Sequence, residues 1–382
     1  MAKVASAGGA TPLRGVLPEE IIVWEILVHL PPKSLLRCRS ICRAWRRATS
    51  ARDFLLAHHG RQPSLPIVSG YEYRGSGCEN IHLFDHRAAD AQLQPIVRLG
   101  GSCLEASCDG YLILSKHDMA RTCYSVCNPT TRQHAPLPQL TGYRLLGMYQ
   151  HRPSGEYRLL LGWTLADWHQ IFTLRCYVFT LHCHVFTLGS DQPPRYIEGL
   201  KVASSAYLHT PALVRNSLHW YLGQEASKLV IAFDTTSESF RQMRAPAVPT
   251  DSYIFEMDAT LGIYNYNHFG RNVDIWVLRN YESEVWQHEY RVELPVADIK
   301  GKFERLNDSW AVSVVSVDDA VLLLVSHGGW MFYVNIDGEL VDSFHRDGKI
   351  FYACELRLKQ TLVPHTVFTA LGSYDVDALP FV

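Results

Sequence analysis

The sequence predicts an α+β chain of two units: a small helical unit at the N-terminus and a large all-β domain after it. Apolar residues recur at helical spacing within residues 17–54 and lose that spacing beyond residue 66, where short strand-like runs replace it. Turn residues in the second part recur at intervals of 43 to 61 residues, close to the length of a four-stranded repeat. We therefore expect a disordered lead-in at 1–15, a helical unit at 16–60 and the all-β domain at 61–382.

Three short helices are expected in the N-terminal unit. The first starts at Pro18, because the first helical turn tolerates proline, and it must end before Pro31-Pro32. The second runs from about Lys33 to Arg47. Ser50 followed by Asp53 resembles a capping box at the start of the third helix, which Gly60 closes.

The first helix is apolar around about 260° of its circumference, and only Glu25 and His29 interrupt it. A helix of this kind is usually buried on nearly every side. A unit of about forty residues is too small to bury it alone. The remaining face must therefore be covered by the rest of the chain or by another protein.

Charge is distributed unevenly along the chain. Residues 1–60 contain nine Lys and Arg against four Asp and Glu, a net charge of +5, whereas the remainder carries −7 of the total of −2. A basic unit would be steered towards an acidic partner. Alternatively, Arg39, Arg43, Arg46 and Arg47 form a solvated helix face.

The composition favours a protein of the cytoplasm, the nucleus or both. No stretch approaches eighteen uninterrupted apolar residues, and the first fifteen residues lack the apolar block of a signal peptide, so we expect no membrane partner. Ten cysteines in 382 residues do not indicate a disulfide framework. Cys38 and Cys42 are expected on the inner face of the second helix with Leu35, Ile41 and Trp45.

The all-β region contains a recurring unit of an apolar strand, a polar turn and a more polar strand. Its turn markers are Asp85, Asn128, Gly189, Asp234, Asn280 and Asp337. Six markers predict a β-propeller of about six blades, and a pair of β-sandwiches is the competing architecture. The C-terminal strands expected at 350–358 and 361–369 could complete the first blade or form a seventh.

No motif for catalysis, metal binding or nucleic-acid binding stands out. The chain lacks a GxSxG elbow, a P-loop and a GxGxxG sequence, and its aromatic residues are not interleaved with basic ones. His182 and His184 share one strand face, but no third metal ligand is indicated. We expect no cofactor and no metal. Trp163, Trp168 and His169 fall in the longest interval between markers, where they could form a binding hot spot or fill a blade core.

The helical unit resembles the F-box. That motif has the pattern LPxxLLxEILxRLP-xxSLLRxRxVCxxWR, and the matching residues here are Leu17-Pro18, Glu25-Ile26-Leu27, Leu30-Pro31, Ser34-Leu35-Leu36-Arg37 and Cys42-Arg43-Ala44-Trp45-Arg46. One departure is an extra residue around Trp24, because Glu25 lies eight positions after Leu17 where the commoner pattern has seven. The extra residue puts the register of the first turn in question.

The β region resembles the plant F-box-associated domain. The phrases that carry this likeness are Ser107-Cys108-Asp109-Gly110, Cys127-Asn128-Pro129-Thr130-Thr131-Arg132, Leu137-Pro138, Leu218-His219-Trp220, Phe233-Asp234 and Asp274-Ile275-Trp276-Val277-Leu278. They occur in the order typical of that family. Cys127 stands where the family usually has Trp.

Together, the two resemblances imply a non-catalytic substrate receptor of an SCF-type cullin ubiquitin ligase. The F-box would bind a Skp-family adaptor, which links the chain to the cullin, and the β domain would hold a target protein for ubiquitination. The implied adaptor-facing residues are Leu17, Pro18, Ile21, Ile22, Ile26, Leu27, Leu30, Pro31, Leu35 and Leu36. Two alternatives are an F-box scaffold without a degradative role and a propeller that binds a small ligand such as a glycan.

Overall fold

The computed structural model divides the chain into two compact units, Met1–Gln62 and Pro63–Val382, and each is described by itself. The expected lead-in at 1–15 lies outside the described residues. The structure describes residues 17–370 except for 73–77, 86–92, 119–120, 164–177, 204–209, 224–227, 250–251, 258, 267–270, 303–309, 318–319, 328 and 346–348. Within these ranges, no helix combines the length and the apolar character that a membrane span requires.

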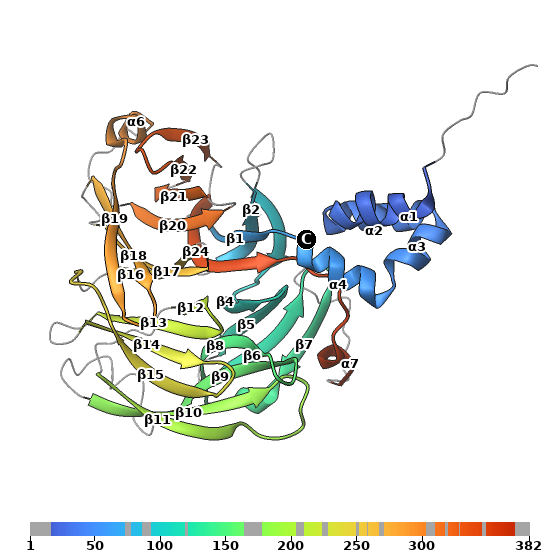
Figure 1. Cartoon of the computed structure of the whole chain (residues 1–382), viewed down its shortest axis with the longest axis horizontal. Coiled ribbons are helices and arrows are strands. Elements are labelled where there is room, and N and C mark those ends of the chain that lie inside the picture. The colour runs from blue at the N-terminus through green and yellow to red at the C-terminus, as the bar shows by residue number, and fades with distance from the viewer. Residues whose placement is uncertain are drawn as a thin grey trace, which may run out of the picture. The chain divides into compact units, whose positions relative to one another are not determined.

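The first unit is helical, as expected, but its second helix is divided (Figure 1). The elements are α1 (Glu19–Ile21), a π-helical turn η1 (Ile22–Ile26), a 3₁₀ turn η2 (Leu27–His29), α2 (Pro32–Ile41), α3 (Arg43–Thr49) and α4 (Arg52–Arg61). Cys42 has an extended backbone, with φ −129° and ψ 123°, which ends α2 and lets α3 start in a new direction. The expected capping box is wrong, because the Ser50 hydroxyl donates to the Arg46 carbonyl and no side chain caps α4.

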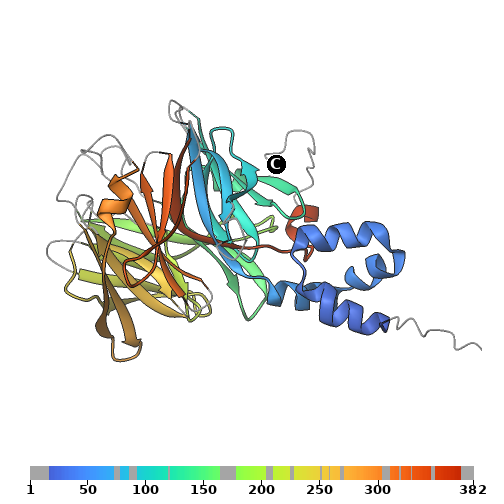
Figure 2. The same cartoon turned by 90° about the horizontal axis from the view of Figure 1, so that it is seen from above.

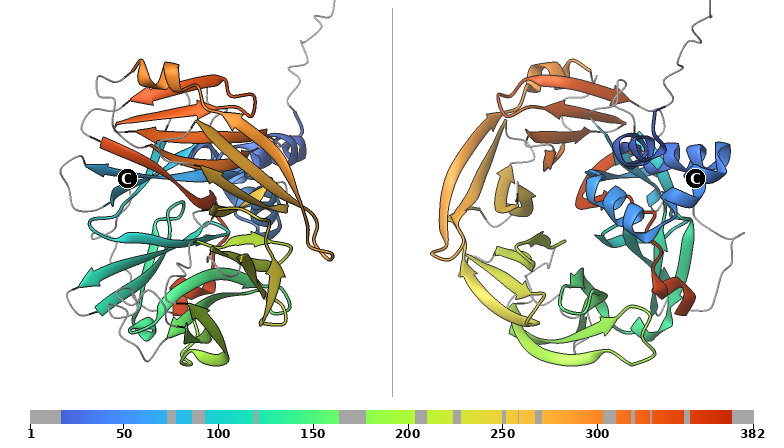
Figure 3. Two further views of the ribbon diagram at one scale, coloured as in Figure 1. Left: turned by 90° about the vertical axis from the view of Figure 1, so that its left-hand side faces the viewer. Right: turned by 45° about the vertical axis from the view of Figure 1, so that its right-hand side comes forward.

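The second unit is a β-propeller of six four-stranded blades arranged as a ring (Figure 3). From the centre outwards, the blades are β24-β1-β2-β3 (blade 1), β4 to β7 (blade 2), β8 to β11 (blade 3), β12 to β15 (blade 4), β16 to β19 (blade 5) and β20 to β23 (blade 6). The strands are β1 (Ser64–Glu72), β2 (Cys78–Phe84), β3 (Leu93–Arg98), β4 (Cys103–Cys108), β5 (Tyr111–Asp118), β6 (Arg121–Asn128), β7 (Gln133–Leu137), β8 (Arg144–His151), β9 (Glu156–Trp163), β10 (Val178–Thr187), β11 (Arg195–Ala203), β12 (Ala212–Val214), β13 (Ser217–Gly223), β14 (Lys228–Asp234), β15 (Ser239–Arg244), β16 (Ser252–Met257), β17 (Thr260–Tyr266), β18 (Asn272–Asn280), β19 (Val285–Glu293), β20 (Ala311–Val317), β21 (Ala320–His327), β22 (Trp330–Val334), β23 (Leu340–His345) and β24 (Lys349–Lys359).

Each predicted turn marker lies at or just after the end of the third strand of a different blade. In blades 2, 4, 5 and 6 the physical reason is an Asx turn, in which a side-chain oxygen replaces a backbone acceptor. Asn128 Oδ1 accepts hydrogen bonds from the backbone N–H groups of Thr130 (3.0 Å) and Thr131 (3.3 Å), and Asp234 and Asn280 make the same bonds in blades 4 and 5. In blade 6 the acceptor is Asn335, two residues before the marker.

The ring closes in blade 1, where the C-terminal strand β24 pairs antiparallel with β1 (Figure 2). This resolves the open choice in favour of completing the first blade. The second expected C-terminal strand, 361–369, is wrong, because the chain leaves the sheet after β24 and forms a short helix, α7 (Thr366–Ala370). Val367 and Phe368 of this segment are buried in a core shared with blades 2 and 3.

Blade 2 holds the end of β24 and the segment after it through two of the sequence phrases singled out above and the neighbouring Tyr111. The Ser107 hydroxyl donates to the Arg357 carbonyl (2.6 Å), the Asn128 amide to the Thr361 carbonyl (3.3 Å) and the Tyr111 hydroxyl to the Val363 carbonyl (3.3 Å). Gly110 lies against the same segment at φ +91°. These phrases therefore help to close the ring.

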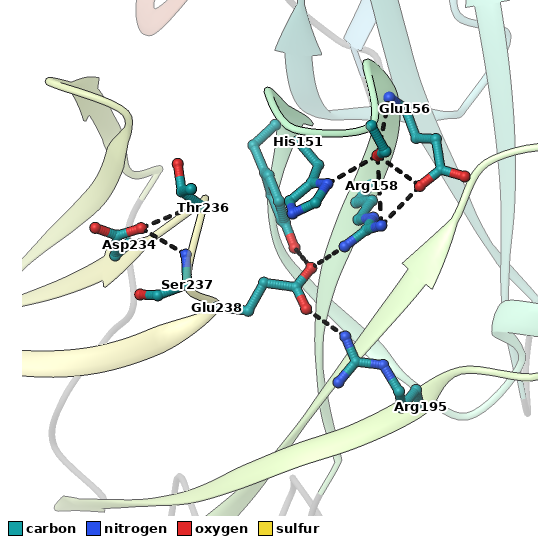
Figure 4. A network of polar contacts seen from close by, with 10 residues as sticks. His151, Glu156, Arg158, Arg195, Asp234, Thr236, Ser237 and Glu238 are labelled. Atoms are coloured by element: carbon teal, nitrogen blue, oxygen red, sulfur yellow. Dashed lines mark hydrogen bonds and ion pairs between the residues drawn. The ribbon is translucent and has the colours of Figure 1, made fainter.

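Glu238 connects blades 3 and 4 (Figure 4). It follows the Asx turn of Asp234 in the left-handed region, at φ +55°. Its buried carboxylate accepts hydrogen bonds from Tyr149 of β8 (2.8 Å) and Arg158 of β9 (2.6 Å) and pairs with Arg195 of β11. Burial by itself would raise the pKa of Glu238, but these donors outweigh it and hold the pKa below its usual range.

A second contact of this kind connects blades 4 and 5. Tyr281, from the turn between β18 and β19, shares a hydrogen bond of 2.8 Å with the buried His219 of β13. The guanidinium carbons of Arg241 and Arg215 lie 4.6 Å and 5.1 Å from the centre of its ring, within the range of cation–π attraction. Residues in outer turns thus reach the preceding blade.

We predict that Gly110→Ala destabilises the propeller more than Gly142→Ala. Both glycines have φ +91°, so both variants carry the strain of a left-handed alanine, about 1–2 kcal/mol. A Cβ at Gly110 would lie 2.4 Å from Thr361 Cγ2 and 2.8 Å from the Lys359 carbonyl oxygen, whereas nothing lies within 4 Å of one at Gly142. Overpacking should add about 1–3 kcal/mol to the loss of unfolding free energy in urea. Equal losses would contradict a role for Gly110 in ring closure.

We also predict that Glu238→Gln lowers the unfolding free energy at pH 7 by about 1–3 kcal/mol, because it removes charged hydrogen bonds from a buried carboxylate. The matched control is Glu284→Gln at the equivalent turn position, φ +56°, whose partner Arg244 is exposed, so its loss should stay within about 1 kcal/mol. Because the pKa of Glu238 is lower in the folded chain, its contribution is complete above the unfolded pKa and disappears as the pH falls through the folded value. The difference between wild type and Glu238→Gln should therefore shrink on acidification, and a constant difference would contradict the ion pairs.

Candidate functional site

The helical unit has a small core of its own. Val23, Leu27 and Val28 of the first helical segment are buried with Leu35 of α2 and Phe54 of α4. His58 Nε2 lies 2.8 Å from the Leu30 carbonyl oxygen, which attaches α4 to the end of that segment. Burial lowers the pKa of His58. This contact with α4 fixes the position of Leu30 and Pro31.

The π-helical turn η1 accommodates the extra residue of the first helix. The backbone N–H of Leu27 reaches the carbonyl of Ile22, five residues back, as well as that of Val23. A π turn contains one residue more than an α turn of the same rise, so a single insertion leaves the rest of the helix in place. Trp24 lies in this turn, where its ring packs on Phe54 with 5.6 Å between ring centres while 42% of the residue stays exposed. It contributes to the core and to the surface.

An unusual number of large apolar side chains is exposed on this unit. Residues 17–62 expose seven, the same number as the described residues of the far larger second unit. They are Leu17, Ile21, Trp24, Ile26, Leu36, Ile41 and Leu56. Exposed apolar surface at this density marks an interaction site.

The structure sorts the ten predicted adaptor-facing residues by exposure. Leu27 and Leu35 are buried in the core of the unit, and Ile22 and Leu30 are half-buried. The exposed members are Leu17, Pro18, Ile21, Ile26, Pro31 and Leu36. The exposed members are the ones whose side chains are available to a partner.

Ile41 does not lie on the inner face of its helix, contrary to the expectation, since it is 79% exposed. The reason is the break at Cys42: Ile41 is the last residue of α2, and the chain turns away before Trp45. Sequence reasoning missed Ile41 as a surface residue because it assumed one continuous helix. An apolar residue at a helix end carries no sequence signal that distinguishes the two cases.

The arginines of this unit fall into two groups. Arg39 is half-buried, and its guanidinium donates to the Thr49 hydroxyl (2.9 Å) and the Thr49 carbonyl, so it fixes the angle between α2 and α3. Burial lowers its pKa, with a smaller contribution from Arg46. Arg43, Arg46 and Arg47 are exposed. Their positive charge is available to an acidic partner.

On the propeller, Trp163 is exposed at the end of β9, whereas Trp168 and His169 lie outside the described residues. Its ring is 5.8 Å from that of His182 on β10, and His182 and His184 lie 6.1 Å and 5.4 Å from Tyr196 on β11. We call Trp163, His182, His184 and Tyr196 the aromatic row of blade 3. The sequence indicated part of this row, because side chains alternate along a strand and His182 and His184 therefore share one face. Cys183, between them, is buried on the other face.

The described residues contain no group of three or more His, Cys, Asp or Glu side chains arranged to hold a metal ion. The aromatic row contains two imidazoles and no carboxylate. Its chemistry is therefore that of an aromatic contact surface.

Comparison with known proteins finds a matching family model for each of the two units. Residues 92–335 match the model of the F-box associated beta propeller domain, and residues 15–59 match an F-box-like domain. The chain belongs to the family of F-box proteins with an F-box associated beta propeller domain, of the kind found in plants.

The curated relatives include F-box protein At5g10340 of Arabidopsis thaliana, 25% identical, with 74% of this chain and 71% of the relative covered. F-box protein CPR1 of the same plant is 26% identical, with 72% of each chain covered. Among solved structures, TolB from Acinetobacter baumannii matches with a TM-score of 0.43 and 9% identity over 83% of this chain and 72% of that one, a likeness too distant to bear on function. The two domains and these relatives support a substrate-receptor role in SCF ligases in general and binding to a Skp-family adaptor through the F-box.

We predict that Leu35→Ala unfolds the helical unit whereas Leu36→Ala leaves it folded. The two residues are neighbours, but Leu35 is fully buried and Leu36 is exposed. Truncation of a buried leucine removes about 2–5 kcal/mol, a large share of the stability of so small a unit. Limited proteolysis of the full chain, followed between residues 17 and 62, should show rapid cleavage of the Leu35 variant only. Equal cleavage of the two variants would contradict the orientation of α2.

Proposed function

We propose that this chain is the substrate receptor of an SCF-type cullin ubiquitin ligase. Its exposed apolar residues Leu17, Ile21, Ile26, Pro31 and Leu36 bind a Skp-family adaptor, which connects the chain to the cullin. The observation that carries this proposal is the density of exposed apolar side chains on a unit that matches the F-box. Covering such side chains on association is worth about 25 cal/mol per Å².

The propeller would hold a target protein, for which the aromatic row of blade 3 is the candidate surface. Trp163 and Tyr196 are both exposed there, and residues of these types are enriched at binding hot spots. The chain would carry out no bond chemistry. Its contribution would be proximity, because a bound target meets the ubiquitin-carrying enzyme at high effective concentration.

We further propose that the chain acts in the cytoplasm, the nucleus or both. The eight cysteines that the structure describes in detail are all free thiols. Buried thiols such as Cys127 and Cys183, whose pKa values burial raises to about 12, are chemically quiet and suit a reducing compartment.

We predict that Ile26→Ala combined with Leu36→Ala weakens adaptor binding by about ten- to a thousand-fold, because each truncation removes about 0.7–2 kcal/mol of apolar contact with the adaptor. Both residues are exposed, so the fold should be retained. The measurement is calorimetric titration of the purified full chain with a Skp-family adaptor. Val341→Ala is the control, since Val341 is an exposed apolar residue on β23 and should leave the affinity unchanged. Wild-type affinity in the double variant would contradict the docking surface.

The same double variant tests the receptor role in plant cells. Proteins that co-purify with it should include the target at a higher level than with wild type, because the target is held but not delivered for ubiquitination. If a co-purifying protein has the same cellular level and the same ubiquitination with wild type and with the double variant, the chain is a scaffold without a degradative role.

A further inference from the structure

The centre of the propeller contains a cavity of about 400 Å³. Residues from all six inner strands line it, including Cys108 of β4, Tyr149 of β8, Leu213 of β12, Glu256 of β16, Val314 of β20 and Glu355 of β24. A cavity of this size lies within the usual range for small-molecule sites. It belongs to the second unit alone, so it is independent of the adaptor-binding surface.

Charged side chains gather where the inner strands end. Asp109 directly follows β4, and Arg152 directly follows β8. Glu256 is the next-to-last residue of β16, and Arg357 and Lys359 lie in the last three residues of β24. Because the inner strands run in the same direction, these residues lie at one end of the cavity. Glu355 lies four residues before the end of β24, and Ile254 and Val314 come three residues before the ends of their strands. Of the acidic residues that line the cavity, Glu355 comes farthest before the end of its strand.

A β-bulge directs Glu355 into this cavity. Pro66 and Val68 of β1 pair with Arg357 and Ala353, so three residues of β24 face the single Ile67 between them. Bulges re-aim side chains and are frequent next to functional sites. The thiol of Cys354, within the bulge, donates to the Ile67 carbonyl (3.3 Å), which fixes the distorted strand in place.

Among the described residues, no ion pair includes the Glu355 carboxyl. Burial raises its pKa. It lies within electrostatic reach of Tyr264 of β17, whose pKa is raised by burial first and by this carboxyl second. Arg357, two residues away, directs its guanidinium to the backbone carbonyls of Ser316 and Ser64.

We propose that the central cavity binds a small organic molecule that carries a primary amine or a guanidine, and that this group pairs with Glu355. Glu355 is half-buried and lines the cavity without a cationic side chain of the described residues paired to it, so a cationic donor on a ligand would form a charge-assisted hydrogen bond there. Ile254 and Val314 would cover the apolar part of the ligand. The mixed charges at the strand ends, Asp109, Arg152 and Glu256, would contact any polar group at its other end.

Calorimetric titration of the full chain with n-butylamine and with agmatine tests this proposal. At least one of these amines should bind with a Kd of about 10 mM or tighter, and n-butanol, which has the same apolar part without the charge, should bind about tenfold more weakly or not at all. Failure of both amines to bind, or binding of n-butanol as tight as that of n-butylamine, would overturn the proposal without any substitution in the protein.

A variant then assigns the site. Glu355→Gln keeps the shape of the side chain and should weaken amine binding by about tenfold or more, whereas Glu282→Gln, at an exposed turn, should leave it unchanged. Equal affinity in wild type and Glu355→Gln would overturn the assignment. Adaptor binding is measured in the same samples and should be equal in all of them, which separates a failure of this proposal from a failure of the docking surface.

Discussion

The pairing of β24 with β1 is the constraint on which the propeller depends. The first and last blades of the ring meet because the last strand that the structure describes, β24, joins the first blade. The loop that this closes spans almost the whole domain, and the entropic cost of closing a loop grows only slowly with its length, so a modest set of contacts can offset it. Blade 2 supplies them with the turn at Asp109-Gly110 and the amide of Asn128, which bind the chain just beyond β24.

Two further contacts connect neighbouring blades of the ring. Glu238 and Tyr281 both lie in outer turns and both reach back to the preceding blade. In each case a local Asx turn positions the residue, and a distant blade supplies its partners. Blades 3, 4 and 5, whose inner strands all line the central cavity, are connected in this way.

The helical unit combines a folded core with apolar side chains that stay exposed. Its core uses Val23, Leu27, Leu35 and Phe54, leaving apolar side chains such as Ile26 and Leu36 exposed. The π turn at Ile22–Ile26 lets an extra residue enter the first helix without moving the buried positions after it. Buried and exposed apolar residues thus alternate on the same short helices.

The sequence by itself determined the two units, the class of each, the six turns that mark the blades and the identity of most apolar residues available to a partner. These are local properties: helical and strand periodicity, Asx turns and prolines act over a few residues. Tertiary structure decided which of Leu35 and Leu36 is buried, that Ile41 is exposed after the break at Cys42, and that the segment after β24 forms α7. It also decided that Glu355 enters the central cavity, because the bulge forms only when β24 pairs with β1. The paired residues Ser69 and Tyr352 are 283 positions apart in the sequence, and no local pattern records so distant a partner.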